Sequence, residues 1–598
     1  MSNIMNLTAV RNKPSRNGFD LSQKINFTAK VGELMPVWWT PVLPTDSLRV
    51  QVNNFIRTQS LNSAAFARMR GYFDFYFVPF SQMWQHFNTA VTQMNTNLQY
   101  ASGPVISDNK ALSGQLPYFT CEQVAQYIIS LGKKKNSFGF FRSTMTCRLL
   151  EYLGYGNFYP YDPNGSQKWT WQQHPMLNNL ALSPFPLMAY QKIYADYNRY
   201  TQWERTNPST FNMNYITGNG DLNLNLSVSG FTDTFNFLDL RYSNWQKDLF
   251  HGVLPIAQYG EASVAPLGTV NINDASLSPT SSNLRDMILG ISDDSTELKA
   301  VSKLPVQASE AKGEFSSGIV PKFDIVGGSF SAGLSILALR RAEASQKWKE
   351  VSLASEEDYP AQIGAHWGEK PSDFLSGMCR YLGGVTSNLD INTITNTNLA
   401  GDNAALQRAT GTFNAAGGIK FDSAGQYGIV MCVFRALPIL DYTTTGVYFG
   451  TTLTDVTDFP IPEFDRIGME SVPVCRALNP ALETPSSPPI KADAYFGYAP
   501  RYIDWKTAID VSRGEFTNTL ESFVMKFNDD DLFAADSVDY PDNPNVEVDS
   551  IKAGFFKVNP HTVDTLFAVD ADVADHLLCS TFFDVKVVRS LDTNGLPY

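Results

Sequence analysis

Residues 68–80 read RMRGYFDFYFVPF, and this stretch indicates the fold more strongly than any other part of the chain. Eight aromatic side chains fall within residues 71–87: Tyr72, Phe73, Phe75, Tyr76, Phe77, Phe80, Trp84 and Phe87. Aromatic residues pack well on the pleated surface of a sheet. We therefore predict a β-strand covered on both faces, because a solvated face would leave several rings in water.

The two ends of the chain also read as strand. The segment KINFTAKVGELMPVWWT at 24–40 alternates apolar and polar residues until Pro36, which limits it to a sheet edge or a bend. The segment TFFDVKVVRSL at 581–591 alternates in the same way. Strands at both ends predict one large sheet domain whose termini meet. Long helical periodicity is confined to residues 187–204 and 335–353.

Two irregular stretches read as insertions into this domain. Residues 261–320 contain 11 Ser and a single aromatic residue, Phe315. A segment with so few rings contributes little to the main core, so we predict a surface insertion. Residues 154–176 mix turn formers with aromatic residues and predict a second, more ordered insertion.

Composition and charge narrow the function. The chain has 598 residues, of which 43% are hydrophobic, 13% aromatic and 18% charged, as expected for a folded protein with a large core and large interfaces. The net charge of −13 excludes a conventional basic nucleic-acid binder. Residues 1–30 are the exception, because they carry five cations against Asp20 alone. We define residues 1–30 as a basic N-terminal arm.

Several classes of protein are disfavoured. The longest apolar run has six residues, 429–434, which is far below the roughly 20 needed to cross a bilayer, so we expect no membrane insertion. The first residues lack the apolar stretch and cleavage site of a secretion signal. The six cysteines contain no CxxC pair, which predicts free thiols and an intracellular folding environment.

Motifs for catalysis are not found. His561 and His576 flank several aspartates and suggest a metal site, but a loop and turn explain this pattern better. The glycines form neither a phosphate-binding loop nor a nucleophile elbow. We predict no catalytic residues, no metal and no cofactor. Two classes compete, a β-structural assembly protein and a secreted or cytosolic carbohydrate-binding or glycoside-active β protein. In the second class four rings would stack on sugars: Trp38, Trp39, Trp169 and Trp171.

A series of short motifs resembles the major capsid protein of microviruses, above all its gokushovirus-like branch. The first motifs in chain order are FDLS at 19–22, GELMP at 32–36, VLPTD at 42–46 and FYFVP at 75–79 with Trp84. The middle of the chain contains PL-AY-IY at 186–194 with Arg199, and LRY at 240–242 with Trp245, KD at 247–248 and LP at 254–255. The last motifs are LGGV at 382–385, NLAG at 398–401, IGME at 467–470, and FGY at 496–498 with RY at 501–502, Trp505 and GEF at 514–516. Met188, Gln246 and Leu249 depart from the family pattern. Each motif alone is weak evidence for this family, but the occurrence of all of them in the family's order over residues 19–516 is specific to it.

The resemblance implies a fold and a function. It implies an all-β dominated chain, an eight-stranded antiparallel viral jelly roll over residues 19–598 whose long insertions contain helices and loops. The expected insertions include 88–180 and 256–326, the second forming a surface protrusion that contacts a host receptor. It also implies sixty copies in an icosahedral T=1 shell around circular single-stranded DNA, assembled in the cytoplasm of a bacterial host. Scaffold, pilot and small basic DNA-binding proteins are the implied partners.

Two sets of residues are our candidates for contacts in such a shell. Interfaces favour large aromatic residues. The candidate subunit contacts are therefore the four tryptophans, although a core role is equally compatible with each: Trp38, Trp39, Trp169 and Trp171. The candidate nucleic-acid contacts are cations of the basic N-terminal arm, since the rest of the chain is acidic: Arg11, Lys13, Arg16 and Lys24.

Overall fold

The structure is a computed structural model of the chain. It describes residues 15–63, 65–66, 68–92, 116–132, 134–136, 138–159, 180–204, 237–264, 276–279, 323–326, 336–372, 376–395, 407–443, 446–477, 495–525 and 553–593. Residue contacts divide the chain into two compact units. The first unit consists of Met1–Tyr259 and Glu350–Tyr598, and the second of Gly260–Lys349.

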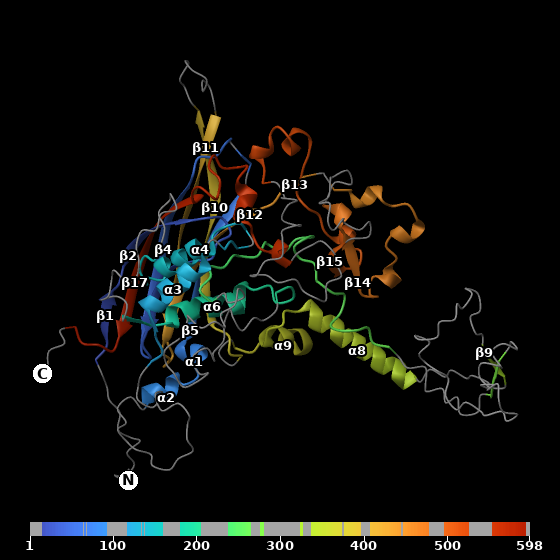
Figure 1. Ribbon diagram of the computed structural model, residues 1–598, viewed down its shortest axis with the longest axis horizontal. Helices are drawn as coiled ribbons and strands as arrows, with labels where there is room; N and C mark the ends of the chain where they lie inside the picture. Colours follow the sequence, from blue (N-terminus) through green and yellow to red (C-terminus); the bar gives the residue numbers. More distant parts are fainter. Residues whose placement is uncertain are drawn as a thin grey trace, which may run out of the picture. The chain divides into compact units, whose positions relative to one another are not determined.

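The first unit is built on a nine-stranded antiparallel sheet (Figure 1). Its strands are β1 (Asn17–Asp20), β2 (Gln23–Ala29), β3 (Met35–Val42), β4 (Ser47–Thr58), β5 (Arg68–Pro79), β10 (Arg380–Thr395), β11 (Gln407–Asp422), β12 (Gly428–Ile439) and β17 (Leu577–Arg589). Along the sheet the order is β1-β17-β4-β11-β10-β5-β12-β3, and β2 also pairs with β17. The first and last strands are therefore neighbours in one sheet, as the strand character of both end segments suggested.

Strands β1 and β2 form one interrupted edge strand. Asp20 lies opposite Lys586 and Gln23 opposite Phe583, so the pairing with β17 keeps the same register across the break. The Ser22 hydroxyl contacts the Asp20 carboxylate and accepts a hydrogen bond of 3.1 Å from the Val585 N–H. Counting β1 and β2 together gives eight strands, as the resemblance implied.

The eight strands form two layers that are joined through β10. Residues 380–388 of β10 pair with β5, whereas residues 389–395 pair with β11. One layer thus has the order β1/β2, β17, β4, β11, and the other has the order β3, β12, β5, β10. If the eight strands are numbered by their order in the chain, the first layer contains strands 1, 8, 3 and 6, and the second layer contains strands 2, 7, 4 and 5. This is the strand order of a jelly roll, so the predicted fold class is confirmed.

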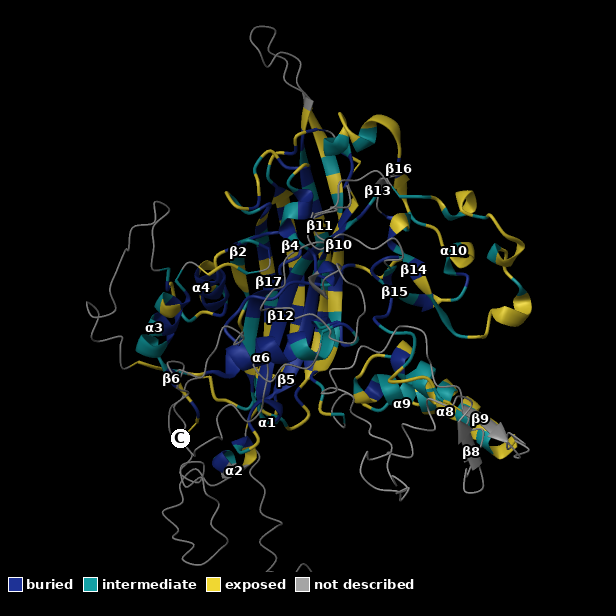
Figure 2. Ribbon diagram, turned by 45° about the vertical axis from the view of Figure 1, so that its right-hand side comes forward, coloured by how far each residue is buried: buried dark blue, intermediate teal, exposed yellow. Residues whose placement is uncertain are grey.

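Aromatic side chains from both layers meet in the core, and Figure 2 shows that much of the sheet is buried. Trp38 of β3 stacks on Phe583 of β17 with ring centroids 5.7 Å apart, and Phe77 of β5 lies 4.6 Å from Phe421 of β11. The aromatic stretch at 68–80 becomes β5, which lies between β10 and β12 and is buried along residues 73–79. Strand β4 instead alternates between exposed and buried residues, because only one of its faces meets the core.

The first long insertion lies between β5 and β10. Its described elements are α1 (Phe80–Met83), α2 (Phe87–Thr92), β6 (Phe119–Thr120), α3 (Cys121–Leu131), α4 (Arg142–Tyr152), β7 (Ala181–Leu182), α6 (Phe185–Ile193), the π-helical turn η4 (Tyr194–Asn198), β8 (Ser276–Pro279), β9 (Phe323–Val326), α8 (Ile336–Ala354) and α9 (Tyr359–Trp367). Helix α6 packs on β5 and β12. The helix predicted at 335–353 is confirmed as α8. The helix predicted at 187–204 is confirmed only in its first part, because α6 becomes a π-helical turn after Ile193 and helical structure ends at Asn198.

The second insertion lies between β12 and β17. Its described elements are β13 (Tyr442–Thr443), η5 (Phe449–Thr451), η6 (Val456–Asp458), η7 (Pro462–Phe464), β14 (Met469–Pro473), η8 (Val474–Arg476), β15 (Tyr495–Pro500), α10 (Ile503–Lys506), β16 (Val511–Ser512), η9 (Gly514–Thr517), η10 (Glu521–Phe523), η12 (Ala553–Phe556) and η13 (Pro560–Val563). The unit Gly260–Lys349 contains the hairpin of β8 and β9 and most of α8. It overlaps the segment 256–326 that we expect to protrude.

Two further properties bear on the sequence predictions. All six cysteines are free thiols, and burial raises the pKa of Cys147 to about 12. Within the described residues, no helix is both long and apolar enough to cross a membrane.

Candidate functional site: subunit and nucleic-acid contacts

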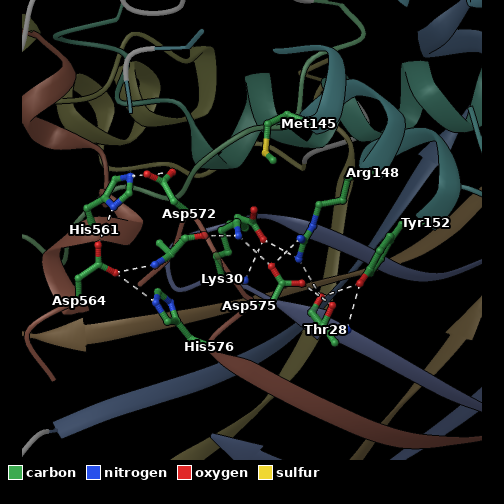
Figure 3. Close-up of polar contacts among 12 residues, drawn as sticks. Thr28, Lys30, Met145, Arg148, Tyr152, His561, Asp564, Asp572, Asp575 and His576 are labelled. Atoms are coloured by element: carbon green, nitrogen blue, oxygen red, sulfur yellow. Dashed lines mark hydrogen bonds and ion pairs between the residues drawn. The ribbon is translucent and has the colours of Figure 1, made fainter. Parts of the chain in front are cut away.

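A buried cluster of ion pairs joins three distant segments of the chain (Figure 3). Arg148 of α4 lies 3.0 Å from the Glu33 carboxylate and 2.8 Å from the Asp575 carboxylate. The Lys30 ammonium lies 3.0 Å from Asp575, and Glu33 is fully buried. Arg148 also donates a hydrogen bond of 3.0 Å to the backbone oxygen of Thr28 in β2. The cluster therefore fixes the first insertion to both ends of the jelly roll.

The charged groups of this cluster pair with one another, as in a site that stabilises the fold. Burial acts to raise the pKa of Asp575, but the charge and hydrogen bond of Arg148, together with Lys30, hold that pKa well below its ordinary value. The carboxylate is thus ionised at all physiological pH values. Buried pairs of this kind tolerate the loss of one partner poorly, because the remaining charge is left in a medium of low polarity.

The two histidines that suggested a metal site lie beside this cluster. The Nδ1 atom of His561 is 2.7 Å from the Asp564 carboxylate, and the Nε2 atom of His576 is 3.5 Å from its other oxygen. His561 stacks on Phe140 and His576 on Phe567, so both rings are held by packing. In the part of the chain that the structure describes, no group of three or more His, Cys, Asp or Glu side chains is arranged to hold a metal ion.

The four candidate interface tryptophans occupy different environments. Trp38 is only 3% exposed and packs between the two layers, which favours the core role over a subunit contact. Trp39 is half-buried and donates a hydrogen bond of 3.0 Å to the backbone oxygen of Leu153. Trp169 and Trp171 lie outside the described residues.

The candidate nucleic-acid contacts are only partly described. Arg11 and Lys13 lie outside the described residues. Arg16 is exposed at the start of the first strand, where its guanidinium donates a hydrogen bond of 2.6 Å to the Thr45 backbone oxygen. Lys24 is exposed on β2. Both described cations are therefore available to solvent at the edge of the β17-containing layer.

A group of exposed rings lies in the second insertion, where sequence reasoning named no interface. Tyr448 is 64% exposed, Phe459 50% and Trp505 45%. Phe449 joins these rings, with centroids 4.7 Å from Tyr448 and 5.2 Å from Trp505. We call Tyr448, Phe449, Phe459 and Trp505 the exposed aromatic cluster. A cavity of about 310 Å³ opens beside it, lined by Phe250, Arg476, Asp504 and other residues.

This cluster has the composition of a protein contact. Interfaces are enriched in Tyr, Trp, Phe and Arg, and one large ring beside a cavity can anchor a partner. Trp505 belongs to one of the motifs quoted above, which is the only signal that pointed to it. Tyr448 and Phe459 stand in irregular segments, where no periodicity separates exposed rings from buried ones.

Comparisons with known proteins support a single family. A family model described as "Capsid protein (F protein)" matches residues 8–127 and 171–598. The chain is also similar to "Capsid protein VP1" of Bdellovibrio phage phiMH2K, with 21% identity over 597 residues. That alignment covers 98% of this chain and 95% of the relative.

Proposed function

The chain belongs to the phage capsid protein (F protein) family, and on that basis we propose that sixty copies form an icosahedral T=1 shell around a circular single-stranded DNA genome. Family membership makes the protein a structural component of the virion that acts in many copies. The observation that carries the proposal is the eight-stranded jelly roll within a family match over most of the chain. The carbohydrate-active alternative loses support, since Trp38 is buried and cannot stack on a sugar.

Electron microscopy of the purified protein tests this proposal directly. The chain is expressed with its genome, and particles are imaged in negative stain and then treated with nuclease. We expect closed particles of one size that protect circular DNA, and the released DNA should be digested by a nuclease specific for single strands. Open sheets, a soluble monomer or protected duplex DNA would each contradict the proposal.

The charge of the chain bears on the proposed partners. Sixty copies at −13 each would carry about −780, so such a shell does not neutralise its genome as a polycation. We therefore include a small basic DNA-binding protein among the partners, with scaffold and pilot proteins assisting assembly in the cytoplasm of the bacterial host. Mass spectrometry of purified particles should then find a short basic protein alongside this chain.

The basic N-terminal arm is proposed to face the genome. Changing Arg11, Lys13 and Arg16 together to Gln should give closed shells that retain DNA poorly. The alternative is that the arm braces a neighbouring subunit. Failed assembly with unchanged packaging in the remaining particles would favour that alternative.

The segment 256–326 is proposed to protrude and to contact the host receptor. Its support is that Gly260–Lys349 is a compact unit separate from the jelly roll. Shortening this segment should leave particle assembly intact but reduce adsorption to host cells. If assembly is lost instead, the segment belongs to a contact between subunits.

A further inference from the structure

One outer surface of the jelly roll carries an unusual combination of side chains. It is the solvent face of the layer formed by β1/β2, β17, β4, β11 and the second half of β10, and we call it the β4 face. More exposed and more buried residues alternate along β4, β11 and β17 (Figure 2). Successive side chains of a strand point to opposite faces, so every second residue belongs to this face. Six cations lie on it: Lys24, Arg49, Arg57, Arg408, Lys420 and Lys586. Four carboxylates accompany them: Asp20, Asp390, Asp422 and Asp584.

The strand register brings these cations together from distant parts of the sequence. Arg49 of β4 lies directly opposite Lys586 of β17 on one side and Lys420 of β11 on the other. Three cations therefore form a row across three adjacent strands. Like charges directly opposite each other destabilise a sheet. The stability of the isolated chain thus gives no reason for this row.

Carboxylates neutralise only one end of the row. Lys586 pairs with Asp20 and lies 3.3 Å from Asp584. Arg49 and Lys420 form no ion pair with any residue that the structure describes. In a chain whose net charge is −13, this leaves a local excess of positive charge at a solvent-exposed position. An anion that spans neighbouring strands fits this position.

Exposed rings stand beside the cations. Phe55 is 40% exposed and Phe582 is 42% exposed, and the register makes them diagonal neighbours on β4 and β17. The Arg57 guanidinium lies over the Phe55 ring at 5.2 Å, and Lys24 is directly opposite Phe582. Exposed amides of the same face fill the positions between them: Asn26, Gln51, Asn53 and Asn414.

We infer that the β4 face binds single-stranded nucleic acid, with its cations on phosphates and with Phe55 and Phe582 stacked on unpaired bases. The inference rests on the proposed function, because it names the surface through which the shell would contact its genome. A flat sheet with exposed rings and surrounding cations is a general platform for single strands, since every base has a face that stacks. Duplex DNA fits less well, because its bases are already stacked. Lys24 and Arg16 place the start of the chain beside this surface.

The test compares two variants that lose the same charge. In the first, Arg49, Arg57 and Lys420 on the β4 face are changed to Gln. In the control, Arg340, Arg341 and Lys347 are changed to Gln on the exposed side of α8. All six side chains are exposed, so neither variant should affect folding.

Binding of the full-length chain to a labelled oligothymidylate of about 20 nucleotides is measured by fluorescence anisotropy at several salt concentrations. Each phosphate contact contributes about 0.7 to the slope of log affinity against log salt. The β4-face variant should therefore lower the slope by about 2 and weaken binding on the order of a hundredfold at 0.1 M salt. The control variant should change neither quantity.

A second variant addresses stacking. Changing Phe55 and Phe582 to Leu should weaken binding at least tenfold, since each stacked base contributes about fivefold or more to affinity and two are lost. The slope should stay unchanged, because no cation is lost. A hydrophobic contact with another subunit would not show this separation of affinity from salt dependence.

Two outcomes would overturn the inference. One is an equal slope for the β4-face variant and the control. The other is a β4-face variant that binds the oligonucleotide normally but no longer forms shells, which would make the face an interface between copies. Neither outcome is confused with failure of the proposed function, because that function is judged by whether the unaltered chain forms closed particles with protected single-stranded DNA.

Discussion

Replacing Arg148 by Met tests how much the buried ion-pair cluster contributes to the fold. Arg148 contacts the Glu33 carboxylate at 3.0 Å and the Asp575 carboxylate at 2.8 Å. Methionine keeps most of the apolar stem and is also a good helix former, so α4 should still form. The change removes the charge, and Glu33 is then left fully buried without a cation.

The magnitude follows from this geometry. Removing one partner of a buried pair costs about 3–5 kcal/mol, mostly because the remaining charge is uncompensated. Lys30 still lies 3.0 Å from Asp575, so the cost should come mainly from Glu33. A double variant with Arg148→Met and Glu33→Gln removes both charges. It should be less destabilised than the single variant, because no unpaired carboxylate is left.

The assay is urea unfolding of the full-length subunit, followed by tryptophan fluorescence at pH 7 and at lower pH. The pKa of Asp575 is depressed in the folded state, so its stabilisation is present above the unfolded pKa near 4 and is lost as the pH falls through the folded value. Without Arg148 that loss should begin at a higher pH. A destabilisation below about 1 kcal/mol, or a double variant that is less stable than the single one, would refute this reasoning.

Four further predictions concern single positions. His561→Gln should reduce the free energy of unfolding by less than about 1 kcal/mol. A hydrogen bond to the Asp564 carboxylate raises the pKa of His561, so the stability difference from the unaltered chain should be largest below pH 6.5 and vanish as the pH rises through the folded pKa. Unfolding curves recorded at a series of pH values measure this difference. Trp38→Ala should cost about 3–5 kcal/mol of unfolding free energy. Trp505→Ser should leave unfolding almost unchanged and prevent shell closure in electron micrographs, and precipitation of unfolded subunits would show instead that this ring supports the fold. Gly32→Ala should cost about 2 kcal/mol or more, since Gly32 has φ of +84° and a Cβ there would lie 2.6 Å from Val558, and a soluble variant with unchanged midpoint of unfolding would disprove this constraint.

The sequence was sufficient for those features that depend on local pattern. The aromatic stretch at 68–80 could only be a strand covered on both sides, and it becomes β5 with β10 and β12 as neighbours. The alternation at 581–591 gave β17, and the strand character of both ends gave their pairing. These predictions hold because a period of two residues fixes which side chains face the core.

The sequence was not sufficient where tertiary contacts decide. Trp38 and Trp39 are adjacent and equally apolar, yet one is buried between the layers and the other binds the backbone of Leu153. Strand β3 does not alternate cleanly, because its pairing with β12 shifts register between Cys432 and Val433. The layer order itself required the family resemblance, since β5 and β10 pair across a long insertion that no local pattern spans.

The motif GELMP at 32–36 shows why the family resemblance predicted the fold correctly. Gly32 takes a positive φ where the chain leaves β2, Glu33 enters the buried ion-pair cluster, and Met35 begins β3 in the other layer. The motif therefore encodes the turn by which the chain crosses between layers. The cations Arg49 and Lys420 of the β4 face belong to none of the quoted motifs, and only the strand register brings them side by side. A resemblance built on such motifs identifies the scaffold, whereas the contacts that we propose with the genome were inferred from the register of this particular chain and require their own measurement.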